Sequence, residues 1–272
     1  MKTQRGPLRN TFRWRGAKGN HTLPSGLDDY PRAPQRSDLE EHIDLLSWMI
    51  MSSNALSKIS KAIDLYDVPQ YKLIEDELIQ TLQERYWNDK IKAYCDYDGQ
   101  QSTSPIFWCG LILLSINVFV TDKFVEHLGY VSIFPLLFGL VPIDSPRLDH
   151  LLALMENDNL LRSNFGLRSL AKTDDYFGTA ENYWRGPVWV NINYLTLRAL
   201  HRYYISVDGP YTARARSVYT NLRRNLIYNM FKVWKRSGDI YENYNPTTGA
   251  GQGQHPFAGW SSLIVLIMAE IY

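Results

Sequence analysis

Residues 187–199 read PVWVNINYLTLRA. Val188, Ile192, Leu195 and Ala199 recur every three or four positions, which is the spacing of one face of an α-helix. Pro187 suits the first helical position, because the amide hydrogen that proline lacks would have no partner in the first turn. The stretch therefore predicts an amphipathic helix that begins at Pro187.

The same helical period recurs through the rest of the chain. A capping box at residues 37–40, with Ser37 and Glu40, predicts the start of another helix. Residues 260–272 are apolar almost all round, which predicts a buried last helix. No sustained alternating stretch indicates a sheet. Further helices are expected over residues 39–50, 74–86, 210–226, 123–138 and 146–155. The sequence therefore predicts an all-α protein built from paired helices.

The composition gives no support to some classes of partner. The 272 residues carry a net charge of +1, so electrostatics gives no reason to expect nucleic acid or an anionic membrane as partner. The 8 Trp and 18 Tyr suit a sugar-binding site, although the same residues also pack protein cores. We find no metal-ligand spacing and no Walker lysine, and therefore expect no metal and no cofactor.

Two features of the chain stay open at this stage. Cys95 and Cys109 could pair or remain free thiols. The apolar run Ile106–Val120 is too short for an ordinary spanning helix, which needs about 20 residues. We expect a buried helix there, with a membrane anchor or a segment outside the fold as alternatives.

Three loops concentrate polar and aromatic residues. They cover residues 23–32, 181–189 and 241–260. Glycoside hydrolysis needs two carboxyl groups, a proton donor and a base or nucleophile. Asp28 and Asp29 lie in the first loop and Glu242 in the third. From the residues alone, the aspartates could equally serve a turn, and Glu242 could be an ordinary surface glutamate.

The second loop offers Arg185, which could orient a carboxylate, and two sugar platforms, Trp184 and Trp189. A structural ion pair and core packing remain the alternative for these residues.

Five segments of the chain resemble the eukaryotic α-glucosidases of glycoside hydrolase family 63. These are SGLDDYPRA (25–33), LGYVSIFPLL (128–137), FGLRSL (165–170), YWRGPVWVNINY (183–194) and PFAGWSSL (256–263). Several ordered motifs spread over most of the chain are far more specific than one short motif. The related trehalases share Ser-Gly-x-Asp and Trp-Arg-Gly but not the Asp-Tyr-Pro-Arg continuation, which disfavours a trehalase-like activity.

The resemblance implies an (α/α)6 toroid of helical hairpins and an inverting mechanism. By motif, Asp28 would be the general acid and Glu242 the general base. The substrate would be the terminal α-1,2-linked glucose of the triglucosylated N-glycan, in the lumen of the endoplasmic reticulum. Substrate contacts would come from Asp29, Tyr30, Arg32, Trp184, Arg185, Trp189, His255 and Trp260.

The family also implies parts that residues 1–272 do not match. We expect these residues to be the C-terminal part of the catalytic domain, with an incomplete toroid. The N-terminal β-sandwich domain and the membrane anchor are expected to be absent, so membrane association would need that anchor. An inactive fragment that serves as a glycan-binding or structural helical module is the alternative function.

Overall fold

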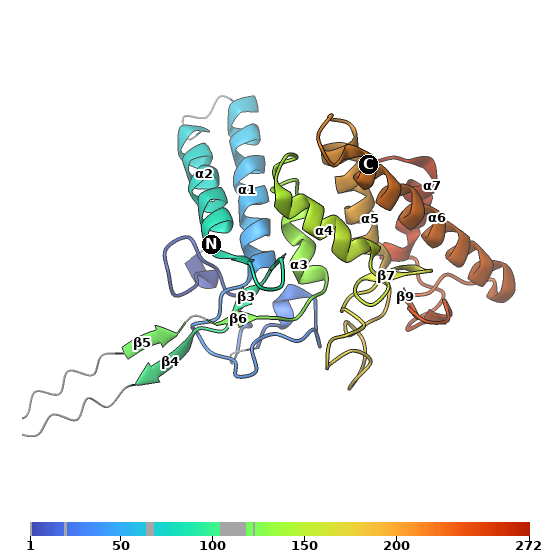
Figure 1. The fold of residues 1–272 in the computed structure, drawn as a ribbon, viewed down its shortest axis with the longest axis horizontal. Helices are drawn as coiled ribbons and strands as arrows, with labels where there is room; N and C mark the ends of the chain where they lie inside the picture. Colours follow the sequence, from blue (N-terminus) through green and yellow to red (C-terminus); the bar gives the residue numbers. More distant parts are fainter. Residues whose placement is uncertain (1, 19–20, 64–67, 104–117, 122) are drawn as a thin grey trace, which may run out of the picture.

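A computed structural model describes residues 2–18, 21–63, 68–103, 118–121 and 123–272 (Figure 1). Helices dominate this part of the chain, which confirms the prediction of a helical protein. The α-helices of the described residues are α1 (Ile43–Ala62), α2 (Val68–Arg85), α3 (Tyr130–Leu137), α4 (Pro146–Glu156), α5 (Val190–Ala199), α6 (Thr212–Ser237) and α7 (Ile264–Ala269).

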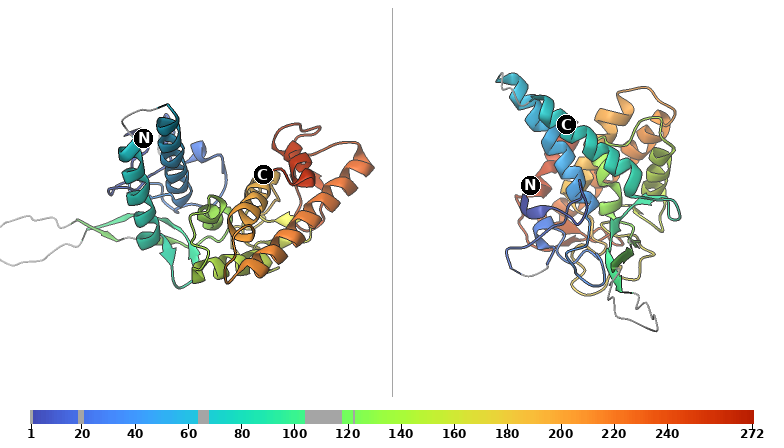
Figure 2. Two further views of the ribbon diagram at one scale, coloured as in Figure 1. Left: turned by 90° about the horizontal axis from the view of Figure 1, so that it is seen from above. Right: turned by 90° about the vertical axis from the view of Figure 1, so that its left-hand side faces the viewer.

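The helices follow one another in a curved row. The pair α1 and α2 lies at one end, and α6 with α7 lies at the other (Figure 1). Seen from above, α3, α4 and α5 lie between the two ends (Figure 2). No helix among the described residues has the length and apolarity that a bilayer crossing requires.

The β-structure of the described residues consists of five antiparallel strand pairs. They are β1 (Trp87–Asn88) with β2 (Ala93–Tyr94), β3 (Asp96–Tyr97) with β6 (Phe124–Val125), β4 (Gln100–Thr103) with β5 (Val118–Thr121), β7 (Arg162–Ser163) with β8 (Gly166–Leu167), and β9 (Asn243–Tyr244) with β10 (Gly251–Gln252). Each strand has two to four residues, so these pairs join loops and do not form a layer of their own.

The predicted helix over residues 106–120 lies largely outside the described residues, because the structure describes none of 106–117. At its end the prediction is wrong, since Val118–Thr121 forms β5 and pairs with β4. The sequence of β5, VFVT, is made of β-branched and aromatic residues, which favour an extended backbone. Cys95 is a buried free thiol, and burial raises the pKa of that thiol. Cys109 lies outside the described residues.

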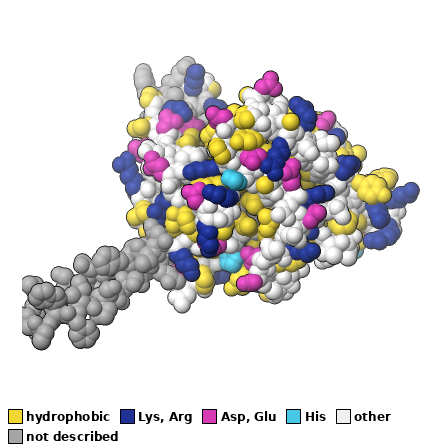
Figure 3. Space-filling model, in the orientation of Figure 1, with side chains coloured by type: hydrophobic (Ala, Val, Ile, Leu, Met, Phe, Trp, Pro, Cys, Tyr) yellow, Lys and Arg dark blue, Asp and Glu magenta, His cyan; other side chains and the backbone are white. Residues whose placement is uncertain are grey.

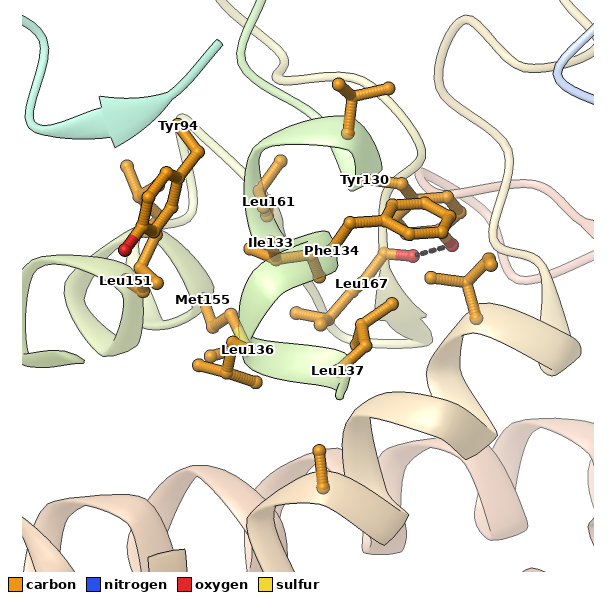
Figure 4. Close-up of a cluster of buried hydrophobic side chains, with 14 of the residues drawn as sticks. Tyr94, Tyr130, Ile133, Phe134, Leu136, Leu137, Leu151, Met155, Leu161 and Leu167 are labelled. Atoms are coloured by element: carbon orange, nitrogen blue, oxygen red, sulfur yellow. Dashed lines mark hydrogen bonds between the residues drawn. The ribbon is translucent and has the colours of Figure 1, made fainter. Parts of the chain in front are cut away.

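The core centres on α3, all of whose side chains are buried (Figure 4). Tyr130 is the polar centre of this core: its hydroxyl donates to the Leu167 carbonyl at 2.7 Å. The same oxygen accepts from the Trp189 amide at 3.1 Å and from Asn193 Nδ2 at 2.9 Å. One buried hydroxyl thus joins α3 to β8 and to the start of α5, where the second loop ends.

The first helix begins later than its capping box predicts, at Ile43. Glu40 does accept from the Ser37 amide at 2.6 Å, but its carboxylate also binds the buried guanidinium of Arg13 at 3.2 Å. The amide of Ile43 donates to Asp96 Oδ1 at 2.8 Å. A residue remote in sequence therefore caps α1.

The start of α5 is also displaced, from Pro187 to Val190. Val188 is extended and pairs with Tyr244, with N···O distances of 2.8 and 3.0 Å. This pairing links the second loop to the third. Beyond Ala199 the helix continues as a π-helical segment, Leu200–Ile205.

The helices expected over residues 74–86 and 210–226 correspond to α2 and α6, and each buries an apolar face. Leu78 and Leu82 are buried on α2, and Val218, Leu222 and Leu226 on α6.

The prediction of a buried last helix is wrong for one of its faces. Residues 260–269 form a short 3-10 segment, Trp260–Leu263, followed by α7. Val265 is 63% exposed and Met268 is 58% exposed. Phe231 and Trp234, near the end of α6, are also exposed. Figure 3 shows acidic and basic side chains interspersed over most of one face of the molecule, with a hydrophobic group at the end where α6 terminates.

Candidate active site

The first loop is joined to the second by Asp29. Its carboxylate accepts from the amides of Tyr183 (3.0 Å) and Trp184 (2.6 Å). Its carbonyl oxygen accepts from Arg185 Nε at 2.6 Å, and this Nε lies 3.7 Å from Asp29 Oδ2. The predicted contact between Arg185 and a carboxylate therefore exists, but its main bond is to the backbone. Asp29 acts as a clamp between two loops.

Asp28 has a different environment. The residue as a whole is exposed, but its carboxyl is partly desolvated. This desolvation is the largest cause that raises the pKa of Asp28, followed by the negative charges of Asp29 and Glu181. Each of these effects disfavours the ionised carboxylate. They favour the protonated form of the Asp28 carboxyl.

Glu242 lies in the third loop, immediately before β9. Its Oε1 accepts from the Tyr183 hydroxyl at 2.5 Å, and its Oε2 accepts from the Gln254 amide at 3.2 Å. The Glu242 amide in turn donates to the Gln254 carbonyl at 3.0 Å, and Trp260 Nε1 donates to the Glu242 carbonyl at 2.8 Å. Both the backbone and the carboxylate of Glu242 are thus fixed.

Tyr183 lies between the two groups of carboxylates. Burial is the main cause that raises the pKa of its phenol, followed by the hydrogen bond and charge of Glu242 and by the charges of Asp28 and Asp29. The first and third loops, far apart in sequence, therefore converge on one side chain of the second. Sequence reasoning missed Tyr183; its signal was its place next to Trp184 in a loop rich in functional residues.

The predicted sugar platforms are mostly internal. Trp184 and Trp189 stack with ring centroids 3.9 Å apart and planes 6° apart. Trp184 is 4% exposed and Trp189 is fully buried, so neither offers an open ring face to a sugar. For these two residues the core-packing alternative holds. Trp260, 5.6 Å from the Trp189 ring, is only partly buried and is the tryptophan of the set that remains accessible.

Tyr30 and Arg32 are buried as well, so the prediction of direct substrate contact is corrected for both. The Tyr30 hydroxyl donates to the His127 carbonyl at 3.2 Å. Arg32 forms ion pairs with Asp44 and Asp96, each at 2.6 Å. A buried guanidinium needs such partners because desolvation of an unpaired charge is costly. Arg32 therefore anchors the first loop to α1 and β3.

His255 is exposed within the third loop. Its Nδ1 lies 3.0 Å from Asp239 Oδ2, and its ring packs against Tyr241 with centroids 4.5 Å apart. In the described part of the chain, no group of three His, Cys, Asp or Glu side chains could hold a metal ion.

Comparisons with known proteins give the arrangement a context. Residues 1–270 match the sequence profile described as the glycosyl hydrolase family 63 C-terminal domain. A probable mannosyl-oligosaccharide glucosidase of Schizosaccharomyces pombe is 42% identical over 262 residues, which are 96% of this chain and 30% of that protein. The mannosyl-oligosaccharide glucosidase of Saccharomyces cerevisiae is 38% identical over 264 residues, 95% of this chain and 30% of that protein. The chain thus spans about a third of the length of these relatives.

Solved structures agree on the fold. The family 63 mannosylglycerate hydrolase of Thermus thermophilus, in complex with glucose, superposes with a TM-score of 0.59 at 18% identity, over 86% of this chain and 49% of that chain. The neutral trehalase of Saccharomyces cerevisiae gives 0.60 at 14% identity, over 90% of this chain and 41% of that chain. At such low identity these likenesses show the helical fold alone.

Proposed function

The chain belongs to glycosyl hydrolase family 63, and from this membership we propose that it removes the terminal α-1,2-linked glucose from the triglucosylated N-glycan precursor. Relatives named mannosyl-oligosaccharide glucosidases, at 38–42% identity over nearly the whole chain, support this substrate class. The reaction belongs to N-glycan processing in the lumen of the endoplasmic reticulum. We further propose that residues 1–272 form the C-terminal part of a six-hairpin toroidal catalytic domain.

The proposed mechanism inverts the anomeric carbon. The Asp28 carboxyl donates its proton to the glycosidic oxygen while the C1–O bond breaks. Glu242 takes a proton from a water molecule, whose oxygen bonds to C1 on the opposite face of the ring. The raised pKa of Asp28 supports its role as acid. This route needs carboxyl groups roughly 6.5–9.5 Å apart, which leaves room for the water.

The observation that carries the proposal is the convergence of the carboxylates on Tyr183. Its hydroxyl binds Glu242, its amide binds Asp29, and the charge of Asp28 also acts on its phenol. These contacts support the proposal that an acid and a base from loops at opposite ends of the sequence act in one site.

Glucose release from a triglucosylated oligosaccharide tests the proposal. The wild-type protein should release glucose, whereas Asp28→Asn and Glu242→Gln should lower the rate by about 10²–10⁴-fold, the usual contribution of an acid or base. Asp208→Asn, an exposed aspartate after α5, is the matched control and should retain full activity.

A folded wild-type protein that releases no glucose from this substrate, but still binds it, would instead support a glycan-binding module. Release of glucose from trehalose in preference to the oligosaccharide would support a trehalase-like enzyme.

A further inference from the structure

We infer that Tyr183 is a positioning residue, which holds the base Glu242 against the water and ties it to the loop of the acid. This inference rests on the proposed function and adds a role that the family motifs alone did not assign to Tyr183.

The contact with Glu242 is the first support. The hydroxyl of Tyr183 donates to Glu242 Oε1 at 2.5 Å, and the backbone amide of Gln254 donates to Glu242 Oε2 at 3.2 Å. A carboxylate has about four lone-pair positions, so two remain for a water molecule. Because each oxygen has one fixed donor, the plane of the carboxylate is set before substrate binds.

The backbone of Tyr183 supplies the second support. Its amide donates to Asp29 Oδ2 at 3.0 Å, so the residue that holds the base also holds the neighbour of the acid. One residue of the second loop is therefore bonded to both of the proposed catalytic loops.

The ring of Tyr183 is itself held in place. The backbone carbonyl of Tyr183 accepts a hydrogen bond from Trp189 Nε1 at 2.9 Å. The rings of Tyr183 and Trp189 meet edge to face, with their centroids 4.6 Å apart. Trp189 is fully buried and stacked on Trp184. A side chain fixed by such packing can orient a catalytic group closely, which is what transition-state stabilisation needs.

Hydrolysis of α-glucosyl fluoride separates this role from that of the acid. Fluoride leaves from C1 without a proton donor, while the water that attacks C1 still gives its proton to Glu242. Asp28→Asn should therefore retain turnover of the fluoride. Tyr183→Phe, which keeps the ring and removes the hydroxyl, should lower kcat about tenfold or more with KM changed less than twofold.

A double-mutant comparison distinguishes positioning from general stability. In the Glu242→Gln background, Tyr183→Phe should cause no further loss, because the group that it positions is already disabled. Tyr228→Phe, on the exposed face of α6, is the control and should leave kcat unchanged. Thermal unfolding of each variant checks that the fold is retained.

A kcat for Tyr183→Phe within twofold of the wild type, or an equal further loss in the Glu242→Gln background, would overturn the inference while leaving the proposed function intact. A wild-type protein that turns over neither the oligosaccharide nor the fluoride would overturn the proposed function, and this inference with it. If Tyr183→Phe failed to fold, substitution of Tyr183 by a fluorinated tyrosine should still change kcat at constant KM, and an unchanged kcat would count against the role.

Discussion

Asp28 and Asp29 are adjacent and chemically identical, yet their surroundings differ. Asp29 accepts two backbone amide hydrogens from the second loop. Asp28 has a raised pKa and faces solvent. The raised pKa of Asp28 favours the protonated carboxyl that the proposed general acid requires.

Glu181→Gln should move the basic limb of the pH–rate profile to lower pH. Glu181 is one of the charges that raise the pKa of Asp28, so its neutralisation should lower that pKa and let the acid lose its proton sooner. The basic limb of kcat/KM reports the acid of the free enzyme. A profile of kcat/KM against pH for both proteins measures the shift, and a basic limb that moved upward would contradict the assignment of Asp28.

At this scale the sequence indicated which loops matter better than which atoms act. Arg185 contacts Asp29, and Glu242 contacts the neighbouring Tyr183, so the three predicted loops are joined, whereas the catalytic roles of Asp28 and Glu242 stay predictions. Arg32 and Trp189 were expected to contact substrate, but both are buried against other protein groups. The sequence could not predict this, because only the fold decides which end of an amphipathic side chain meets solvent. The role of Tyr183 depends on a contact with a residue 59 positions away, which no local pattern encodes.

Among the structural elements, the third loop is held by the β9–β10 pair and by a tight turn. Gly253 has a φ of +73°, and a Cβ there would collide with Glu242 Oε2. The loop therefore needs glycine both for its backbone conformation and for the space that the base occupies.

Gly253→Ala should lower kcat by more than tenfold, because the added methyl group would displace the Glu242 carboxylate. The control is Gly238→Ala, at the end of α6, where φ is +80° and nothing lies within 4 Å of the added Cβ. In both variants alanine must adopt a positive φ, which costs about 1–2 kcal/mol, so the unfolding temperature should fall in both while only Gly253→Ala loses activity. Equal activities of the two variants would contradict the predicted clash.

The N-terminus of α1 is fixed by an element that local sequence cannot identify. The capping box at residues 37–40 predicts an earlier start, but Glu40 is drawn to Arg13 and Asp96 caps the helix from β3. Helix interiors were predictable from their apolar period, whereas these two helix starts depended on tertiary partners. The same holds for Val188, which pairs with Tyr244 and leaves α5 to begin at Val190.

Asp44→Asn should weaken the anchor between the first loop and α1. Burial alone would raise the pKa of Asp44, but the Arg32 guanidinium outweighs it and the net pKa is lowered. A lowered folded-state pKa gives stability that is present above the unfolded value, about pH 3.9, and lost as pH falls through the folded value. The variant should lose ~3 kcal/mol of unfolding free energy at pH 7, as expected when one partner of a buried ion pair is removed.

Urea unfolding at pH 7 and pH 3 measures this difference. The gap between wild type and Asp44→Asn should narrow at pH 3, because the Asp44 carboxyl of the unfolded wild-type chain is then protonated and part of the stability that the lowered folded-state pKa supplies is lost. A gap that stayed constant would show that Asp44 does not contribute through its ionised form.

On the scale of the whole molecule, the curved row of helices exposes apolar side chains at both ends. Ile59 on α1, Ile63 just after α1 and Leu73 on α2 are exposed at one end. Phe231, Trp234 and Met268 are exposed on α6 and α7 at the other. Contiguous exposed apolar surface of this kind marks interaction sites or promotes aggregation. The sequence predicted the helical class, but it predicted burial for the last helix, because an apolar helix does not reveal whether a neighbour covers it.

A variant with Phe231→Ser and Trp234→Gln should associate less than the wild type at equal protein concentration. Both rings are at least half exposed, so their removal costs little packing and leaves the site loops unchanged. Light scattering over a concentration series measures the association, with Tyr228→Phe as the control that keeps an exposed aromatic ring. Unchanged scattering would show that the exposed side chains at this end of the molecule do not mediate self-association.

The most direct test of the central claim follows the anomer of glucose that is released first, by proton NMR during cleavage of the triglucosylated oligosaccharide. We predict that β-glucose appears first and that Glu242→Gln abolishes its appearance, because the water attacks the face opposite to the leaving group. Initial release of α-glucose, or β-glucose release that persists in Glu242→Gln, would contradict the assignment of Asp28 and Glu242 as an inverting acid–base pair.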